Sequence, residues 1–359
     1  MKWRNLALLP LIAVIVVVQV VCSATDSVFY LTQLTMSAYY SLLIIGLCVL
    51  MGYAGQISLG HAGFFAIGGY LAAALTTRSL VAFQDTLPVR LLHAAGCLIA
   101  GQDIYGEALL VVTPWAACAI AVLTAAAVAL LLGIPVLKLK GHYLAMATLG
   151  FGIIIYRIVL ASSYFGEADG ISGVPGFTLL PGLSVSGEFS SRVENYYIAW
   201  GVLLLGMLLL RNLIDSRAGR ALRAIHGSIE AADAVGVDTA RFKLYTFVLS
   251  AVFASLAGVL LTHYNGGIGP SEASIMKSVR YVAIVAVGGM ANIWGALIMG
   301  VVLNFLSLRG LFGSYDDAVF GLILILIMLF APGGILNLRL GGLWERFGPK
   351  GKSRKEGAT

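Results

Sequence analysis

The sequence predicts an all-α, polytopic membrane protein with about ten transmembrane helices, and two observations support this fold class. Of the 359 residues, 59% are apolar and 11% are charged, whereas soluble domains carry roughly 25% charged residues. The apolar residues also fall into long runs, and a helical crossing takes roughly 20 apolar residues. The whole chain, residues 1–359, is therefore expected to form one membrane domain.

Ten segments are predicted to cross the membrane. They are 6–24, 34–51, 56–77, 113–135, 143–163, 195–212, 243–263, 276–290, 293–310 and 317–331. A cleaved signal peptide is the alternative for the first segment, because Cys22-Ser23-Ala24 is an acceptable cleavage site. The large number of later spans favours an uncleaved helix. The mixed interval 78–112 is expected to be an external loop with short helical or re-entrant pieces.

The basic residues set the predicted orientation, because loops rich in Lys and Arg stay on the cytoplasmic side. Lys138 and Lys140 lie in one such loop, and further basic residues crowd the segment 215–243 and the tail 332–359. The loop 164–194 is rich in Gly, Pro and Ser and is expected outside. Ten spans then place both termini and the segment 215–243 in the cytoplasm. The net charge of +6 is explained in the same way and does not indicate a nucleic-acid partner.

The segment 215–243 is the longest polar stretch between predicted spans. Leu222, Ile225, Ile229 and Ala232 recur in it at helical spacing, with charged residues on the other side. This pattern predicts a short amphipathic helix on the inner face. Its apolar stripe has three candidate partners, namely the lipid surface, the protein's own spans and another subunit.

Several kinds of chemistry are not expected of this chain. Its four cysteines show no metal-ligand spacing, and His61 has no acidic or cysteine partner at ligand spacing. Gly351-Lys352-Ser353 lacks the preceding glycine of a phosphate-binding loop, since that position is Arg346. No Ser, His and Asp grouping suggests catalysis. We therefore expect a chain that is not an enzyme and binds neither metal nor cofactor.

Six stretches share the order of a known family. They are GQISLGHAGFFAIGGY (55–70), LKGHYLAMATLGFG (139–152), GISGVPG (170–176), GRALRAI with EAADAVGV (219–237), AVGGMANIWGALIMG (286–300) and FAPGGIL (330–336). Together they resemble the permease family of branched-chain amino-acid ABC transporters, in particular its M-type subunit. The resemblance implies an importer subunit of the bacterial inner membrane that works by alternating access. It also implies two ATP-binding subunits that hydrolyse the ATP, a second related permease, a periplasmic substrate-binding protein and surrounding lipid as partners.

Three departures from the family pattern leave the substrate open. Ile153 stands where the family often has an acidic residue, Glu167-Ala168 replace a Gly-rich approach to the GISG stretch, and 78–112 is longer than usual. The alternative substrates within the family are urea and short-chain amides. A more distant alternative is a secondary transporter, which usually carries acids at mid-membrane. The acids of this chain fall almost entirely in predicted loops.

The resemblance assigns contact with the ATPase to residues of the segment 215–243, which we call the coupling segment. These residues are Gly219, Arg220, Arg223, Glu230, Ala231, Ala232 and Gly236. Two alanines let another surface approach closely, and Gly236 is expected to end the helix with a positive φ. The alternative is an ordinary cytoplasmic linker helix.

The candidates for the translocation pathway are polar or small residues within predicted spans. They are Gln56, Ser58, Gly60, His61, Gly63, Arg157 and Asn304. For the glycines, the alternative is close helix packing. Arg157, taken as the one basic residue well inside a span, is expected to meet a substrate carboxylate or to extend toward the outer headgroups.

Overall fold

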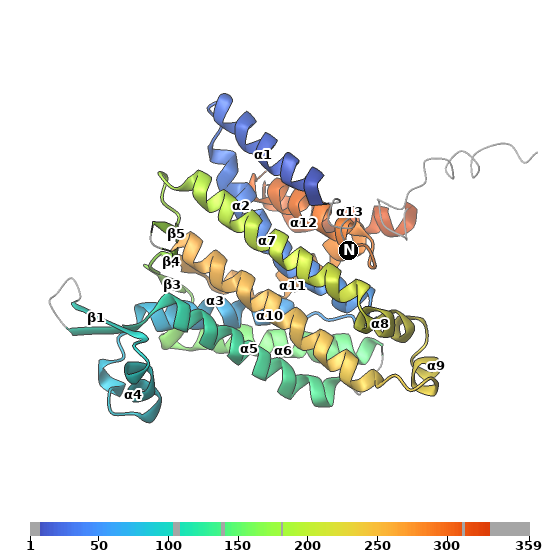
Figure 1. Ribbon diagram of the computed structural model, residues 1–359, viewed down its shortest axis with the longest axis horizontal. Helices are drawn as coiled ribbons and strands as arrows, with labels where there is room; N and C mark the ends of the chain where they lie inside the picture. Colours follow the sequence, from blue (N-terminus) through green and yellow to red (C-terminus); the bar gives the residue numbers. More distant parts are fainter. Residues whose placement is uncertain (1–7, 103–107, 138–140, 181, 311–312, 331–359) are drawn as a thin grey trace, which may run out of the picture.

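The computed structural model (Figure 1) confirms an all-α membrane fold and describes residues 8–102, 108–137, 141–180, 182–310 and 313–330. Lys138, Lys140, the basic tail 332–359 and the first seven residues lie outside the described part. The predictions of their cytoplasmic location therefore stay predictions.

Each of the ten predicted spans coincides with a helix. These helices are α1 (Leu9–Ala24), α2 (Phe29–Gly52), α3 (His61–Thr77), α5 (Pro114–Val136), α6 (His142–Ala161), α7 (Arg192–Asp215), α10 (Thr239–Asn265), α11 (Ile275–Gly288), α12 (Ile293–Leu308) and α13 (Asp316–Phe330). Among the described residues, α2, α5, α6, α7 and α10 are long and apolar enough to cross a membrane. The other five have 14 to 17 residues, so the number of complete crossings stays a prediction.

The centre of the bundle is α2, which is buried along nearly its whole length. It packs against α7, α10 and α12, and α10 also packs closely along α3 and α5. In Figure 1 the helices α5 and α10, which pack against each other, run side by side across the molecule. This arrangement leaves α5 and α6 at the periphery, where much of their surface is exposed.

The end of the bundle that the sequence places outside carries small irregular elements. These are η2 (Val81–Phe83), α4 (Leu87–Ala94), β1 (Leu98–Gln102), β2 (Ala108–Val112), η3 (Ser163–Phe165), β3 (Ile171–Ser172), β4 (Phe177–Leu180), β5 (Leu183–Val185) and β6 (Gly267–Ile268). The next element, η4 (Pro270–Ala273), packs against α3 and α6. Three antiparallel pairs form, β1 with β2, β3 with β6, and β4 with β5.

The interval 78–112 contains short helical pieces, as expected, and also a strand pair that the sequence did not predict. It contains α4, but its second half is the β1–β2 hairpin. The apolar residues Leu80, Val89 and Val112 pack against one another and against Ala117 of α5. They therefore form a small apolar core together with the start of α5.

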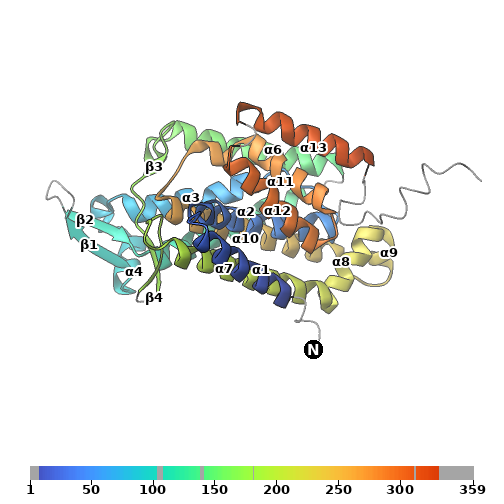
Figure 2. The ribbon, with the colours of Figure 1, turned by 90° about the horizontal axis from the view of Figure 1, so that it is seen from above.

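The coupling segment folds as two helices, α8 (Arg217–Gly227) and α9 (Ile229–Ala234). Figures 1 and 2 place them at the opposite end of the bundle from the β1–β2 hairpin. The two ends are therefore separated by the length of the helices, as the charge pattern predicts for an inner and an outer face.

The connection between α11 and α12 is held against the C-terminal end of α2. Asn292 caps α12 by accepting hydrogen bonds from the N–H groups of Trp294 and Gly295. The hydroxyl of Tyr53, just after α2, donates to the carbonyl of Ala291 at 2.8 Å. This turn therefore fixes the position of two short helices against the central one.

Candidate functional site

Serine side chains cap the start of both helices of the coupling segment. The Ser216 Oγ accepts hydrogen bonds from the N–H groups of Ala218 and Gly219 at 3.1 and 3.4 Å. The Ser228 Oγ accepts one from the N–H of Ala231 at 3.1 Å. Both serines act as N-caps. The expectation of one continuous amphipathic helix was wrong, because Ser228 is extended and starts a second helix.

The apolar stripe of the coupling segment faces the protein's own spans. Leu222, Ile225 and Ala232 are buried, and Ile229 is partly buried. Helix α8 packs against α7 and α10, and α9 against α10. Of the three candidate partners for the stripe, the structure therefore shows the protein's own spans. Ala232 is also removed from the surface, so only one of the two motif alanines is available to a partner.

The outward side of the coupling segment combines charge with small apolar residues. Arg220 and Arg223 of α8 are exposed, as are Ala231 and Ala234 of α9. Val235, directly after α9, leaves 77% of its surface exposed. We call Ala231, Ala234 and Val235 the outward patch. It has the small, apolar character that close contact with another surface requires.

Two of the predicted glycines in the coupling segment have clear conformational reasons. A Cβ on Gly219 would lie 1.9 Å from the carbonyl oxygen of Ile214, so α8 can follow α7 this closely only with glycine there. Gly236 has φ +83° and follows the end of α9, as predicted.

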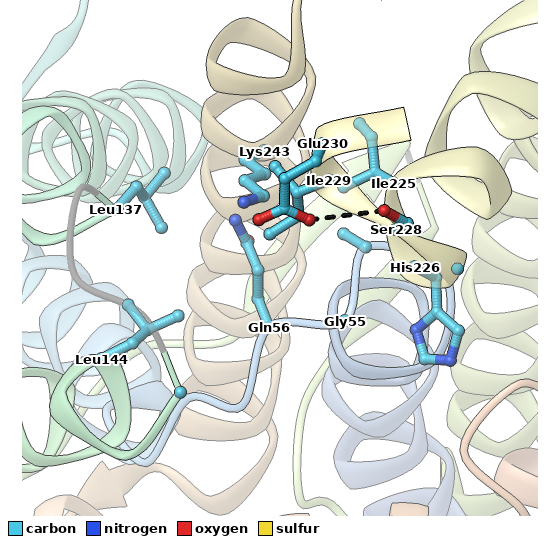
Figure 3. A pocket seen from close by; sticks show the side chains of 13 residues that line it. Gly55, Gln56, Leu137, Leu144, Ile225, His226, Ser228, Ile229, Glu230 and Lys243 are labelled. Carbon is cyan, nitrogen blue, oxygen red and sulfur yellow. Dashed lines mark hydrogen bonds between the residues drawn. The ribbon is translucent and has the colours of Figure 1, made fainter. Parts of the chain in front are cut away.

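A pocket of about 280 Å³ lies between the coupling segment and the loop that precedes α3. Figure 3 shows the side chains of Ile225, Ser228 and Glu230 on one side of it, and Gln56 extending toward Glu230 and Lys243. The Ser228 hydroxyl lies 3.3 Å from Glu230 Oε2 and donates to it. The structure therefore joins one predicted coupling residue, Glu230, to one predicted pathway residue, Gln56.

Gln56 has an unusual environment for an amide. It is 3% exposed, and neither its amide oxygen nor its amide nitrogen has a hydrogen-bond partner among the described residues. Its backbone N–H donates to the carbonyl of Leu50, near the end of α2. A buried amide without partners costs free energy, so this side chain is open to a hydrogen bond from another group.

The start of α3 is a polar junction inside the protein. The predicted span 56–77 is helical only from His61 onward. The His61 Nε2 lies 2.7 Å from Ser250 Oγ of α10. The next N–H, that of Ala62, donates to Ser278 Oγ of α11 at 3.1 Å. Polar side chains from three helices therefore meet where α3 begins.

The glycines beside this junction serve close packing. A Cβ on Gly60 would lie 2.7 Å from the carbonyl oxygen of Thr148 on α6, and one on Gly63 would lie 3.1 Å from the Phe151 ring. Ser58 is buried just before them. These contacts support the packing alternative for Gly60 and Gly63.

Comparison with known proteins identifies the family. The family model described as the permease component of branched-chain amino acid transport systems matches residues 29–328. This chain belongs to that permease family. The match covers both the coupling segment and the α3 junction.

Individual relatives agree with this assignment. The high-affinity branched-chain amino acid permease protein LivM of Salmonella typhimurium is 31% identical over 326 residues, which are 85% of this chain and 69% of LivM. The corresponding LivH of Escherichia coli is 29% identical, over 84% of this chain and 92% of LivH. BraD of Pseudomonas aeruginosa is 28% identical, over 86% and 96%. No solved structure matches the chain.

Two predicted pathway residues of this permease lie apart from the junction. Arg157 is exposed on the outer surface of α6. Asn304 is buried in α12, and its side-chain nitrogen donates to the carbonyl of Gly300 in the same helix at 2.7 Å. Asn304 therefore has a partner within its own helix. No group of three or more His, Cys, Asp and Glu side chains in the described part of the permease is placed to hold a metal ion.

The sequence reasoning missed two ion pairs on α11. Lys277 Nζ lies 3.0 Å from Glu272 Oε1, and Arg280 lies 2.9 Å from Asp316 Oδ2. Describing Arg157 as the one basic residue well inside a span was wrong, because Lys277 and Arg280 lie within the predicted span 276–290. Two cations three residues apart in an apolar run are the signal that would have revealed them.

Proposed function

We propose that this permease is the membrane subunit of an ATP-driven importer of branched-chain amino acids. The observation that carries the proposal is the pocket between the coupling segment and Gln56. A displacement of α8 and α9 would change this pocket, and Gln56 stands five residues before the start of α3. Such a displacement would therefore reach the polar junction inside the membrane.

In this proposal two separate ATP-binding subunits drive alternating access, with one of them docked on the coupling segment. The outward patch and the exposed Arg220 and Arg223 supply apolar and charged contacts for that subunit. A ligand or motor can shift a conformational equilibrium only through contacts that differ between the two states. Glu230, beside Gln56 and Lys243, is where we expect such a difference.

A second, related permease would complete the translocation pathway. The exposed side of α6 is the candidate contact surface, since it carries Arg157. A cation facing lipid is costly, and protein is the better neighbour for it. Surrounding lipid would cover the remaining apolar surface, including that of α5.

A periplasmic substrate-binding protein would dock at the outer end. The segments 164–194 and 264–275 lie there, and a cavity of about 650 Å³ opens between them. Its walls include Ser186, Glu188 and Asn265. In this arrangement the permease resides in the bacterial inner membrane with both termini in the cytoplasm.

The substrate follows from the relatives, which are permeases for branched-chain amino acids. The decisive experiment is a pull-down of the tagged permease in mild detergent, followed by mass spectrometry. Recovery of ATP-binding subunits and a second permease is expected. Recovery of the permease alone, under conditions that preserve a known complex of this kind, would contradict the proposal and favour a secondary transporter.

The coupling role is tested by Glu230→Lys. The new cation would stand beside Lys243 and lose the hydrogen bond from Ser228, so we expect leucine uptake to fall by about tenfold or more while expression is retained. The control is Asp85→Lys, which makes the same charge reversal at an exposed residue of the interval 78–112. Normal uptake in Glu230→Lys would show that this segment does not couple.

A further inference from the structure

A second polar site lies deep in the permease, around Glu272. The Tyr40 hydroxyl donates to Glu272 Oε1 at 3.0 Å, and Tyr40 is halfway along the 24-residue helix α2. The chain after α10 therefore returns toward the middle of the bundle before α11 begins. Helix α11 has 14 residues and is about 21 Å long, less than the roughly 30 Å of a hydrocarbon core.

The carboxylate of Glu272 already receives one ammonium group. Lys277 Nζ lies 3.0 Å from Glu272 Oε1 and 3.3 Å from the Tyr40 hydroxyl. The same nitrogen lies 4.8 Å from the centre of the Tyr40 ring. A carboxylate, a phenol and an aromatic face therefore surround this cation, which is a favourable environment for an amine.

The second carboxylate oxygen of Glu272, Oε2, is buried and has no hydrogen-bond partner among the described residues. The hydroxyls of Tyr70 and Tyr281 are equally without partners in that part of the chain, although both residues are at most 1% exposed. Buried polar atoms are nearly always paired, so these three oxygens are open to a donor that the described residues do not supply.

Tyr281 and Tyr70 each pack against residues of the Glu272 site. The ring centres of Tyr40 and Tyr281 lie 6.2 Å apart. Tyr70 packs in the same buried cluster as Ala273, the residue after Glu272. The Phe65 ring stacks on Tyr40, with centres 5.8 Å apart, and adds an apolar wall.

We propose that Glu272 Oε2 and the hydroxyls of Tyr70 and Tyr281 bind the ammonium group of the transported amino acid. Three acceptor oxygens match the three N–H donors of a primary ammonium group. The side chains of Glu272 and Lys277 are 20% and 23% exposed, so solvent reaches the ion pair, whereas the three acceptor oxygens are buried. This inference rests on the proposed function, because it names the subsite through which an amino-acid substrate is held during import.

The test uses the full permease with its co-purifying partners and measures ligand binding by thermal shift. The probes are L-leucine, 3-methylbutylamine, which keeps only the amine, and 2-hydroxy-4-methylpentanoate, which lacks it. The wild-type complex is expected to bind leucine and the amine but not the hydroxy acid. Glu272→Gln should weaken binding of both amines by about tenfold or more, because a charge-assisted hydrogen bond is lost.

Two further variants keep the result interpretable. Tyr281→Phe leaves the ion pair intact and should weaken amine binding by roughly threefold to tenfold. Asp316→Asn removes a comparable acid, which pairs with Arg280 of α11 instead of Lys277, and should leave amine binding unchanged.

Unchanged amine binding in Glu272→Gln, or equal binding of leucine and the hydroxy acid, would overturn the proposal. Binding of neither amine by the wild-type complex would also overturn it and would mean that only water fills the site. Failure of the proposed function looks different. The wild-type complex would then import no leucine but would still bind 3-methylbutylamine in a manner that depends on Glu272.

Discussion

Helices α2 and α6 are similarly apolar, yet they occupy opposite environments. In the most apolar 18-residue window of each, 89% of the residues are buried for α2 and 28% for α6. Helix α2 carries buried polar residues at Thr35, Ser37 and Ser41. Apolarity therefore identifies a membrane helix, whereas small and polar side chains within it indicate that the helix faces protein.

The exposed side of α6 is a continuous stripe. Tyr143, Met146, Ile154 and Ile158 are between 49% and 71% exposed, and a Cβ on Gly150 would meet nothing within 4 Å. These positions recur at intervals of three and four residues, so they lie on one helix face. In the proposed assembly this face meets lipid or the second permease.

The largest predicted difference between the two helices is the change in stability when a glycine in each is replaced by alanine. Gly52→Ala in α2 puts a Cβ 1.5 Å from the carbonyl oxygen of Met290 and should destabilise the permease by roughly 1–3 kcal/mol or more. Gly150→Ala in α6 meets open space and should stabilise its helix by about 0.5–1 kcal/mol. Thermal unfolding in detergent measures both. A destabilising Gly150→Ala would break the comparison between the two helices.

An intermediate effect, on assembly alone, is expected from a large side chain on α6. Ile154→Trp should leave the permease folded, because Ile154 is 58% exposed, but should reduce recovery of the second permease severalfold in the pull-down. Leu123→Trp on α5, where Leu123 is 67% exposed, is the control. Equal recovery for both variants would assign the α6 face to lipid.

The smallest effect on stability is expected from Arg157→Gln, since the side chain is exposed. Surface substitutions typically change stability by less than about 0.5 kcal/mol. If Arg157 meets a substrate carboxylate, this variant should impair leucine transport far more than amide or urea transport. Similar losses for all three would assign it a structural role, and uptake assays in parallel decide between them.

Features that depend on local pattern could be predicted from the sequence. The apolar runs located each membrane helix, the stripe from Leu222 to Ala232 located the inward face of the coupling segment, and Gly236 marked the end of α9. Ser228 escaped notice because a single capping serine barely changes the apolar pattern. The site at Glu272 could not be inferred, because Tyr40, Tyr70 and Glu272 are distant in sequence and only the return of the chain after α10 brings them together.

The strand pair β3–β6 links two outer segments that are far apart in the sequence. Ile171 pairs with Ile268, and Ser172 with Gly267. Ile268 is four residues before Glu272. A force applied to the loop 164–194 is thus transmitted through backbone hydrogen bonds to the segment that holds the buried carboxylate. In the proposed assembly, docking of a substrate-binding protein on this loop would therefore be mechanically connected to the residues around Glu272.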